Sequence, residues 1–351
     1  GQTIPGTEET IVGPQAKLND LDLRYADFED FLDSIDLRGV DFSGSDLRFA
    51  RFRNVDLTDA NFNDANISFA DFWSVQGLRP EQMYATRSYQ QRDLRRIHAS
   101  TLDLRGGDFA SMDLTDSLFY QVDFDGADFT GANLTDVSAS QSTFQDAIFK
   151  DAIVIDASFG DQITSEQLYS TLSYQQGNLS GIFLASAELS GWDFSNQNLR
   201  AATFNAATVQ NTSFRNANLR HASLLDVNLS TADLSGVDLS FGDLRDSTGM
   251  STDPTVLLRN AILPDARIDG LQLESNESFK ILRPRSNRPP EVRIEGELSL
   301  HPEATVEIAY SRSTGNSTLV TLADTAVDLA GTLRVSSVSS RLIAGLSALV
   351  S

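Results

Sequence analysis

Leucine or phenylalanine recurs at every fifth position through most of the chain, and the pattern is clearest from Leu104 to Leu134. The residue before each centre is usually Asp or Asn, and the one before that is small or apolar, as in Ala127-Asp128-Phe129. An α-helix repeats its buried face every 3.6 residues and a β-strand every 2. A five-residue period therefore predicts a chain that turns a corner once per repeat.

This motif resembles that of the pentapeptide-repeat family over about residues 16–273. The resemblance implies an all-β fold, a right-handed quadrilateral β-helix with four pentapeptides per coil, whose central residues and residues two before them point inward. Ala99 and Ala139 occupy central positions without a bulky side chain and predict thin spots in the core. The expected structural core includes Leu104, Phe109, Leu114, Phe119, Phe124, Phe129, Leu134, Leu184, Leu189, Phe194, Leu199, Phe204, Phe214 and Leu219.

The hydrophobic pattern divides the chain into four parts. Residues 1–15 show no period and are expected to form a flexible lead, and residues 16–273 form the β-helix, with a slip of one residue around Phe31-Leu32. Residues 274–291 are basic and proline-rich, which predicts a stiff linker. Residues 292–351 alternate with a period of 2, which predicts a strand-rich extension. This extension resembles the ends of exported bacterial surface proteins.

Two insertions, at about residues 73–93 and 160–178, interrupt the repeat and resemble each other. Tyr84 and Tyr169 occupy equivalent places 85 residues apart, which indicates a duplicated unit. One interpretation is a loop that presents paired tyrosines to a ligand. The interpretation we favour is that the tyrosine rings pack against the side of the β-helix, because a copied unit carries its loop along whether or not the loop has a function.

Each insertion is predicted to form one short helix. Thr164, followed three residues later by Gln167, has the pattern of a capping box. In the earlier insertion Pro80 stands where the first helical residue is expected, a position that favours proline.

Carboxylates form the main group of candidate functional residues. In a four-sided coil, residues twenty apart stack on one face, which places Asp103 over Asp123 and Asp108 over Asp128. Two unit charges about 4.8 Å apart in water repel by about 0.9 kcal/mol, so such stacks are tolerable and would be relieved by cations. One reading is a calcium-binding or polyanion-mimicking face, and the favoured one is that Asp and Asn satisfy the corner geometry. The candidate interaction face comprises Asp103, Asp123, Asp108, Asp128, Tyr84 and Tyr169.

Composition narrows the functional classes. The net charge of -22 argues against nucleic acid or an anionic membrane as a partner. The chain has no cysteine, no apolar run long enough to span a membrane, and only three scattered histidines, His98, His221 and His301. We therefore expect no catalytic residues, no cofactor and no metal site beyond weak binding of divalent cations.

These observations predict a non-enzymatic, acidic scaffold for an unidentified protein partner, bacterial and exported or at the cell surface, although a cytoplasmic location stays open. The alternative comes from the same resemblance. Some members of the family are DNA mimics whose acidic rods occupy the DNA-binding groove of type II topoisomerases. Inhibition of gyrase supercoiling would distinguish the two readings, and a fall in melting temperature with EDTA would identify a calcium-dependent module.

Overall fold

The structure is a computed structural model that describes residues 2–3, 11–12, 14–28, 36–281, 291–301, 305–309, 319–323, 327–329 and 332–336. The chain divides into two compact units. Unit 1 comprises Gly1–Trp192 and Asn196–Thr203, and unit 2 comprises Asp193–Ser195 and Phe204–Ser351.

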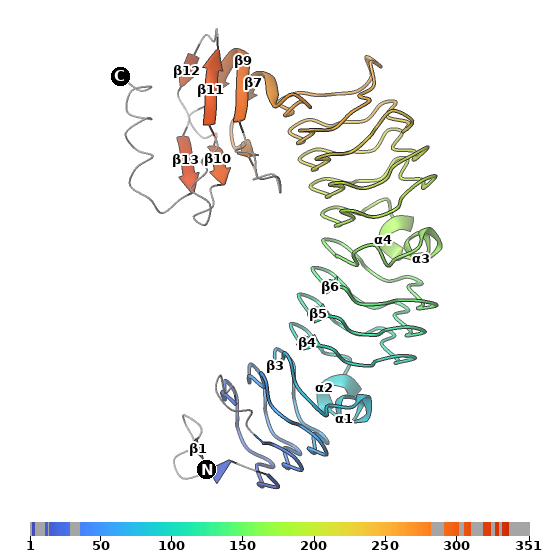
Figure 1. The fold of residues 1–351 in the computed structure, drawn as a ribbon, viewed down its shortest axis with the longest axis vertical. Helices are drawn as coiled ribbons and strands as arrows, with labels where there is room; N and C mark the ends of the chain where they lie inside the picture. The colour runs from blue at the N-terminus through green and yellow to red at the C-terminus, as the bar shows by residue number, and fades with distance from the viewer. Residues whose placement is uncertain are drawn as a thin grey trace. The chain divides into compact units, whose positions relative to one another are not determined.

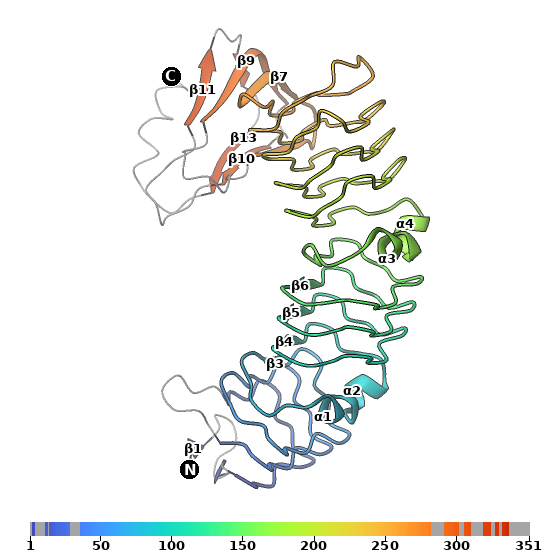
Figure 2. The ribbon, with the colours of Figure 1, turned by 45° about the vertical axis from the view of Figure 1, so that its right-hand side comes forward.

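Unit 1 is a stack of coils (Figures 1 and 2). Asp103 forms a parallel bridge with Asp123, and Asp113 with Asn133, so one coil takes twenty residues, or four pentapeptides. The N–H of Leu104 donates to the carbonyl of Asp123 at 2.8 Å, which ties each coil to the next. The predicted quadrilateral β-helix is therefore confirmed. One side of the stack forms a continuous parallel sheet of β3 (Asp71–Phe72), β4 (His98–Ser100), β5 (Leu118–Tyr120) and β6 (Ser138–Ser140).

The corners of the coils depend on residues that accept a left-handed backbone. The second residue after a centre takes a positive φ, as at Asp116 (59°) and Asp136 (56°). The third residue donates its N–H back to the carbonyl of the centre, as from Ala127 to Phe124 at 2.9 Å. Asp, Asn and Gly adopt this conformation at the lowest cost, which explains why they recur at these positions.

The centres fill the interior of the coils. Phe109 stacks on Phe129 with ring centroids 5.2 Å apart, and Phe129 stacks on Phe149 at the same distance. The two alanine centres, Ala99 and Ala139, are buried in one column with Phe119 between them. All the predicted core positions are at most 3 % exposed: Leu104, Phe109, Leu114, Phe119, Phe124, Phe129, Leu134, Leu184, Leu189, Phe194, Leu199, Phe204, Phe214 and Leu219.

Three coils of unit 1 are longer than twenty residues. Asp27 bridges Arg51, 24 positions later, so this coil holds four extra residues. The predicted slip around Phe31-Leu32 lies outside the described residues. The other two long coils contain the insertions, where Asp71 pairs with His98, 27 positions later, and Ser158 with Phe183, 25 positions later.

Each insertion forms two helices, so the prediction of a single helix was wrong. They are α1 (Pro80–Tyr84) and α2 (Arg87–Gln90) in the first, and α3 (Ser165–Ser170) and α4 (Leu172–Gln175) in the second. The break lies at Thr86 and Thr171, which are extended, with ψ of 151° and 148°. Each hydroxyl accepts the N–H of a residue three positions later, so the threonine caps a new helix.

The predicted helix starts are confirmed. Pro80 is the first residue of α1. Thr164 and Gln167 form the capping box of α3, with the N–H of Thr164 donating to Gln167 Oε1 at 2.9 Å. Gln167 also donates to the carbonyls of Phe144 and Ala147, which fastens the helix to the coil below.

Unit 2 begins with twenty-residue coils and continues as a wider parallel β structure. Its strands are β7 (Arg267–Leu273), β8 (Ser278–Ile281), β9 (Glu291–Leu300), β10 (Thr305–Ala309), β11 (Leu319–Ala323), β12 (Val327–Leu329) and β13 (Thr332–Ser336). In one sheet β7, β11 and β12 pair with β9, and in the other β10 lies between β8 and β13. All these pairings are parallel.

Two parts of the sequence expected to lack regular structure contain strands. The predicted lead includes β1 (Gln2–Thr3) and β2 (Ile11–Val12), which pair antiparallel, and Ile and Val favour strands. The predicted linker includes β8, because its apolar residues alternate; the proline-rich remainder, residues 282–290, lies outside the described residues. Leu258 and Leu263 continue the five-residue period near its end but are only partly buried.

Candidate functional site

The four aspartates of the predicted interaction face lie where the sequence placed them. Asp103 bridges Asp123, and Asp108 bridges Asp128. In each, one carboxylate oxygen accepts the N–H of the residue two positions later; for Asp128 this bond is 2.8 Å long. This contact supports the turn, so the first role of these aspartates is structural.

Arginines relieve the expected repulsion within these stacks. Arg105 forms an ion pair with Asp103 at 2.6 Å and reaches Asp123 at 3.5 Å, so one guanidinium serves two stacked carboxylates. Arg92 pairs with Asp108 at 2.7 Å. Hydrogen bonds from Arg105 and Arg92 lower the pKa of Asp103 and Asp108 respectively.

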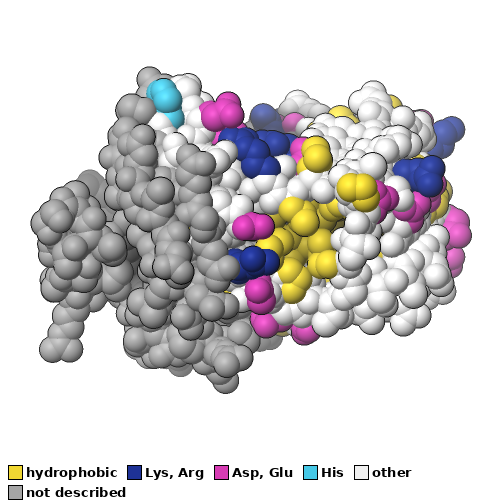
Figure 3. Space-filling model, turned by 90° about the horizontal axis from the view of Figure 1, so that it is seen from above, with side chains coloured by type: hydrophobic (Ala, Val, Ile, Leu, Met, Phe, Trp, Pro, Cys, Tyr) yellow, Lys and Arg dark blue, Asp and Glu magenta, His cyan; other side chains and the backbone are white. Residues whose placement is uncertain are grey.

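Our reading of the sequence missed these arginines, although a local signal was present. The tripeptide Asp-Leu-Arg places the two charges two residues apart on one outward face of a strand. The same bidentate pair forms at Asp22-Leu23-Arg24, where hydrogen bonds from Arg24 lower the pKa of Asp22 to about 2. Figure 3 shows basic side chains beside acidic ones on the face that it draws.

No arginine occurs between residues 106 and 199. This stretch, called here the acidic segment, contains fourteen Asp and Glu residues and a single basic residue, Lys150. Asp116, Asp136 and Asp156 occupy the same corner of successive coils. Burial, together with the charge of Asp136, raises the pKa of Asp156. Arginines that precede the segment reach its first aspartates, as Arg96 reaches Asp116 at 3.1 Å, but the segment itself supplies no arginine to Asp136 or Asp156.

The tyrosines of the insertions do not come together as one site. The rings of Tyr84 and Tyr89 pack against each other, tilted by 35°, with centroids 4.7 Å apart, and the Tyr89 hydroxyl donates to the carbonyl of Asp108 at 2.6 Å. The Tyr84 hydroxyl is buried, and burial raises the pKa of Tyr84 to about 12. A Cβ on Gly107 would lie 2.7 Å from that hydroxyl, so Gly107 makes room for the ring.

The second insertion repeats this arrangement with one difference. The rings of Tyr169 and Tyr174 pack against each other, tilted by 32°, with centroids 4.5 Å apart. Trp192, the residue equivalent to Gly107, makes an edge contact with Tyr169 at 6.3 Å. These contacts favour the interpretation in which the rings pack on the side of the β-helix.

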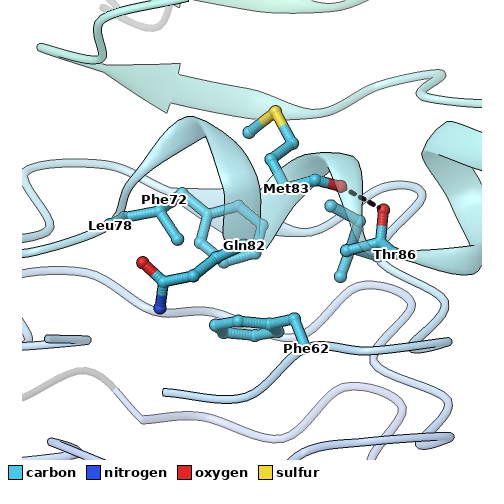
Figure 4. A pocket seen from close by; sticks show the side chains of 7 residues that line it. Phe62, Phe72, Leu78, Gln82, Met83 and Thr86 are labelled. Carbon is cyan, nitrogen blue, oxygen red and sulfur yellow. Dashed lines mark hydrogen bonds between the residues drawn. The ribbon is translucent and has the colours of Figure 1, made fainter. Parts of the chain in front are cut away.

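A small apolar pocket lies beneath the first pair of helices (Figure 4). Met83 and Gln82 of α1 cover Phe62 and Phe72, and Gln82 donates to the carbonyl of Ala60 at 2.7 Å. The lining contains no charged group, so the pocket offers no catalytic chemistry. Within the described ranges no group of His, Cys, Asp or Glu is arranged to hold a metal ion. No described helix has the length and hydropathy needed to cross a bilayer.

Comparison with known families agrees with the coil geometry. The model of pentapeptide repeats, with eight copies, matches residues 35–73, 100–136, 113–151, 123–161 and 212–248. The chain is a pentapeptide-repeat protein. No curated protein was found to match it.

Several solved structures resemble this pentapeptide-repeat protein. HetL, a pentapeptide-repeat protein involved in heterocyst differentiation regulation from the cyanobacterium Nostoc sp., is 23% identical, with 72% of this chain and 94% of that chain covered and a TM-score of 0.20. A pentapeptide-repeat protein of the Arabidopsis thaliana thylakoid lumen is 22% identical, with 34% and 74% covered and a TM-score of 0.19. QnrB1, a plasmid-mediated fluoroquinolone resistance protein, is 16% identical, with 65% and 89% covered and a TM-score of 0.18. Similarities at this level of sequence identity and TM-score do not indicate a function for this chain.

Proposed function

We propose that this protein is a non-enzymatic scaffold whose acidic segment binds a basic protein surface. The observation that carries the proposal is the charge of the acidic segment, fourteen Asp and Glu residues against the single basic residue Lys150. The duplicated sequence shows that arginine at these outward positions is optional: both copies keep the apolar centres and the paired helices, but the arginines at the start of the first copy are not repeated in the second. Arg79, Arg87, Arg92, Arg95, Arg96 and Arg105 correspond, 85 residues later, to Thr164, Leu172, Gly177, Ser180, Gly181 and Ser190.

The duplicated coils fold with and without these arginines, so the fold does not fix the charge at outward positions. Asn or Gly would serve the corners equally well, as they do at Asn211 and Gly131. The excess of carboxylates on a rigid frame makes the local potential more negative and steers a basic partner toward the segment. Binding of this kind weakens as salt rises, because the Debye length falls to about 8 Å at physiological ionic strength.

Two matched variants test this proposal. Each changes four exposed, left-handed corner aspartates to Asn, which tolerates that backbone, so both variants lose the same charge. Proteins bound to each immobilised variant in extract of the source cells are identified by mass spectrometry at 50 and 300 mM salt. The acidic-segment variant, which we expect to lose its salt-sensitive partners, changes Asp136, Asp146, Asp151 and Asp156. The control, expected to keep them, changes Asp20, Asp59, Asp64 and Asp226, of which Asp59 and Asp64 also pair with arginines of the first insertion.

Equal loss in both variants would contradict a role for the acidic segment. Retention of all salt-sensitive partners by both variants would contradict it as well. Salt-insensitive partners would point to a different surface.

The second candidate function is mimicry of DNA toward a type II topoisomerase. The acidic segment favours it, since columns of carboxylates about 4.8 Å apart present a regular polyanion. The coil that contains α3 and α4 interrupts those columns, which is why we place this function second. Inhibition of gyrase supercoiling by the purified chain, lost in the acidic-segment variant, would replace the first proposal.

We also propose export to the cell surface, on the resemblance of the strand-rich extension alone. Fractionation of the source cells, with an antibody against the chain, tests this. Recovery solely from the cytosolic fraction would rule it out.

A further inference from the structure

A column of stacked aromatic rings lies outside the β-helix in the first coils of unit 1. Tyr25 stacks on Phe49 with ring centroids 4.8 Å apart, and Phe49 stacks on Phe69 at 4.7 Å. Tyr25 is 69 % exposed and Phe49 is 37 % exposed. These rings therefore belong to the surface and not to the core.

The backbone beneath this column is strained. Tyr25, Phe49 and Phe69 have φ values of 64°, 65° and 67°, in the left-handed region. A bulky residue there costs about 1–2 kcal/mol relative to its ordinary backbone. Later coils place Asp116 and Asp136 at the same corner, so the turn itself does not call for an aromatic ring. Strain that the fold does not require indicates a function for the side chains.

The flat side next to this column carries further aromatic residues. Trp73 and Tyr120 stack at 5.4 Å along its opposite edge, and Leu118 lies on the same strand as Tyr120. This side is the parallel sheet of β3 to β6 with the strand positions below it. The column and this sheet side together are called here the aromatic face; its large side chains are Tyr25, Phe49, Phe69, Trp73, Leu118 and Tyr120.

Charges on the aromatic face occur as pairs. Arg51 pairs with Asp27 at 3.2 Å. Asp71 is contacted by Arg53 and, at 3.8 Å, by His98. Burial acts to raise the pKa of Asp71, but hydrogen bonds from His98 and Arg53 outweigh it, and the pKa is lowered. On a chain with a net charge of -22, this is a surface with balanced charge.

We propose that the aromatic face binds a second copy of the same chain, face to face. Two copies repel each other over most of their surfaces, because both are strongly acidic. They can approach where each carries paired charges of both signs, since Arg51 of one copy can then meet Asp27 of the other. Tyr, Trp and Arg are the residues that dominate protein interfaces. This inference does not depend on the proposed function.

Two features of the face argue against other occupants. The rings of Phe49 and Phe69 lie against each other, so they present edges and cannot stack on a sugar ring. Arg96 pairs with Asp116 at 3.1 Å, and beyond this pair the column continues with Asp136, which disfavours an acidic ligand there.

Sedimentation equilibrium of the full chain between 1 and 100 μM in 150 mM salt tests the proposal. We expect a mass approaching twice the chain's 38.3 kDa as concentration rises. The double variant Tyr25→Asn and Phe49→Asn should weaken the dimer at least tenfold. Asn is favoured at a left-handed corner, so this variant should melt no lower than the parent, which separates lost binding from lost folding.

A control variant, Asp59→Asn, changes another exposed left-handed corner outside the aromatic face and should leave the dimer unchanged. A parent chain that is monomeric at 100 μM overturns the proposal. A dimer that persists in the Tyr25→Asn and Phe49→Asn variant also overturns it, because the association would then use another surface.

Discussion

Replacement of Phe124 by alanine tests how the interior of the β-helix is stabilised. Phe124 is 1 % exposed, and its ring is surrounded by those of Phe109, Phe119, Phe129 and Phe144, with centroids 5.1–5.6 Å away. A buried Phe→Ala change costs about 3–5 kcal/mol, and aromatic pairs add about 0.5–1.5 kcal/mol beyond burial.

We expect a loss in the upper part of that range, about 4 kcal/mol, because the coils cannot close around the cavity. Their spacing is fixed by backbone hydrogen bonds such as those from Phe124 to Thr143 at 3.0 Å and from Leu104 to Asp123 at 2.8 Å. A repeat protein opens locally, since each coil contacts only its neighbours. Hydrogen exchange of individual amides is therefore the suitable assay.

Protection of the amides of Leu104 and Phe124 should fall by about 10³-fold, which corresponds to about 4 kcal/mol at 1.4 kcal/mol per factor of ten. The control Asp136→Asn, at an exposed corner, should change protection by less than threefold. A decrease at Phe124→Ala of tenfold or less would refute the argument, because it would show that the coils relax into the space.

Three further predictions concern the outer contacts. Gly107→Ala should destabilise unit 1 by about 1–3 kcal/mol in urea unfolding, because the new Cβ would lie 2.6 Å from the Phe109 ring and 2.7 Å from the Tyr84 hydroxyl. Tyr84→Phe removes that hydroxyl and should restore part of the loss; no rescue would show that the clash with Tyr84 does not contribute. The pKa of Asp22 is lowered, so its contribution to stability is present above pH 3.8 and is lost as pH falls toward 2; NMR titration should show that Arg24→Gln raises that pKa, and an unchanged value would contradict the pairing. EDTA should leave the melting temperature unchanged, whereas a fall of several degrees would identify a structural cation.

The coil could be predicted because its period is local. A centre such as Phe109, with Asp108 before it and a small residue two before it, contains the whole rule, and stacking in steps of twenty follows from four sides. This rule alone predicts which positions pair between coils and which side chains form the buried columns.

The break within each helical insertion and the arginine ion pairs were harder to predict from the sequence. The sequence around Thr171 does not show that the helix breaks there. The structure shows that Thr171 is extended and that its hydroxyl caps α4. Our prediction compared residues twenty apart and so missed Arg105, which reaches Asp103 within its own coil and Asp123 in the next. The wide coils of unit 2 depend on parallel pairing between strands that are distant in the sequence, and a local sequence period does not predict such pairing.

Comparison of the two duplicated copies, 85 residues apart, distinguishes the positions that the fold constrains from those that can vary. Phe129 is repeated as Phe214, and the small Ala127 is replaced by the small Thr212, so these inward positions keep the size of their side chains. Outward positions changed freely, since Arg105 corresponds to Ser190. Loss of an exposed Arg–Asp pair costs at most about 1 kcal/mol, which a stack of coils tolerates. Stability therefore does not explain the charge of the acidic segment, and the four-aspartate variants measure what that charge does.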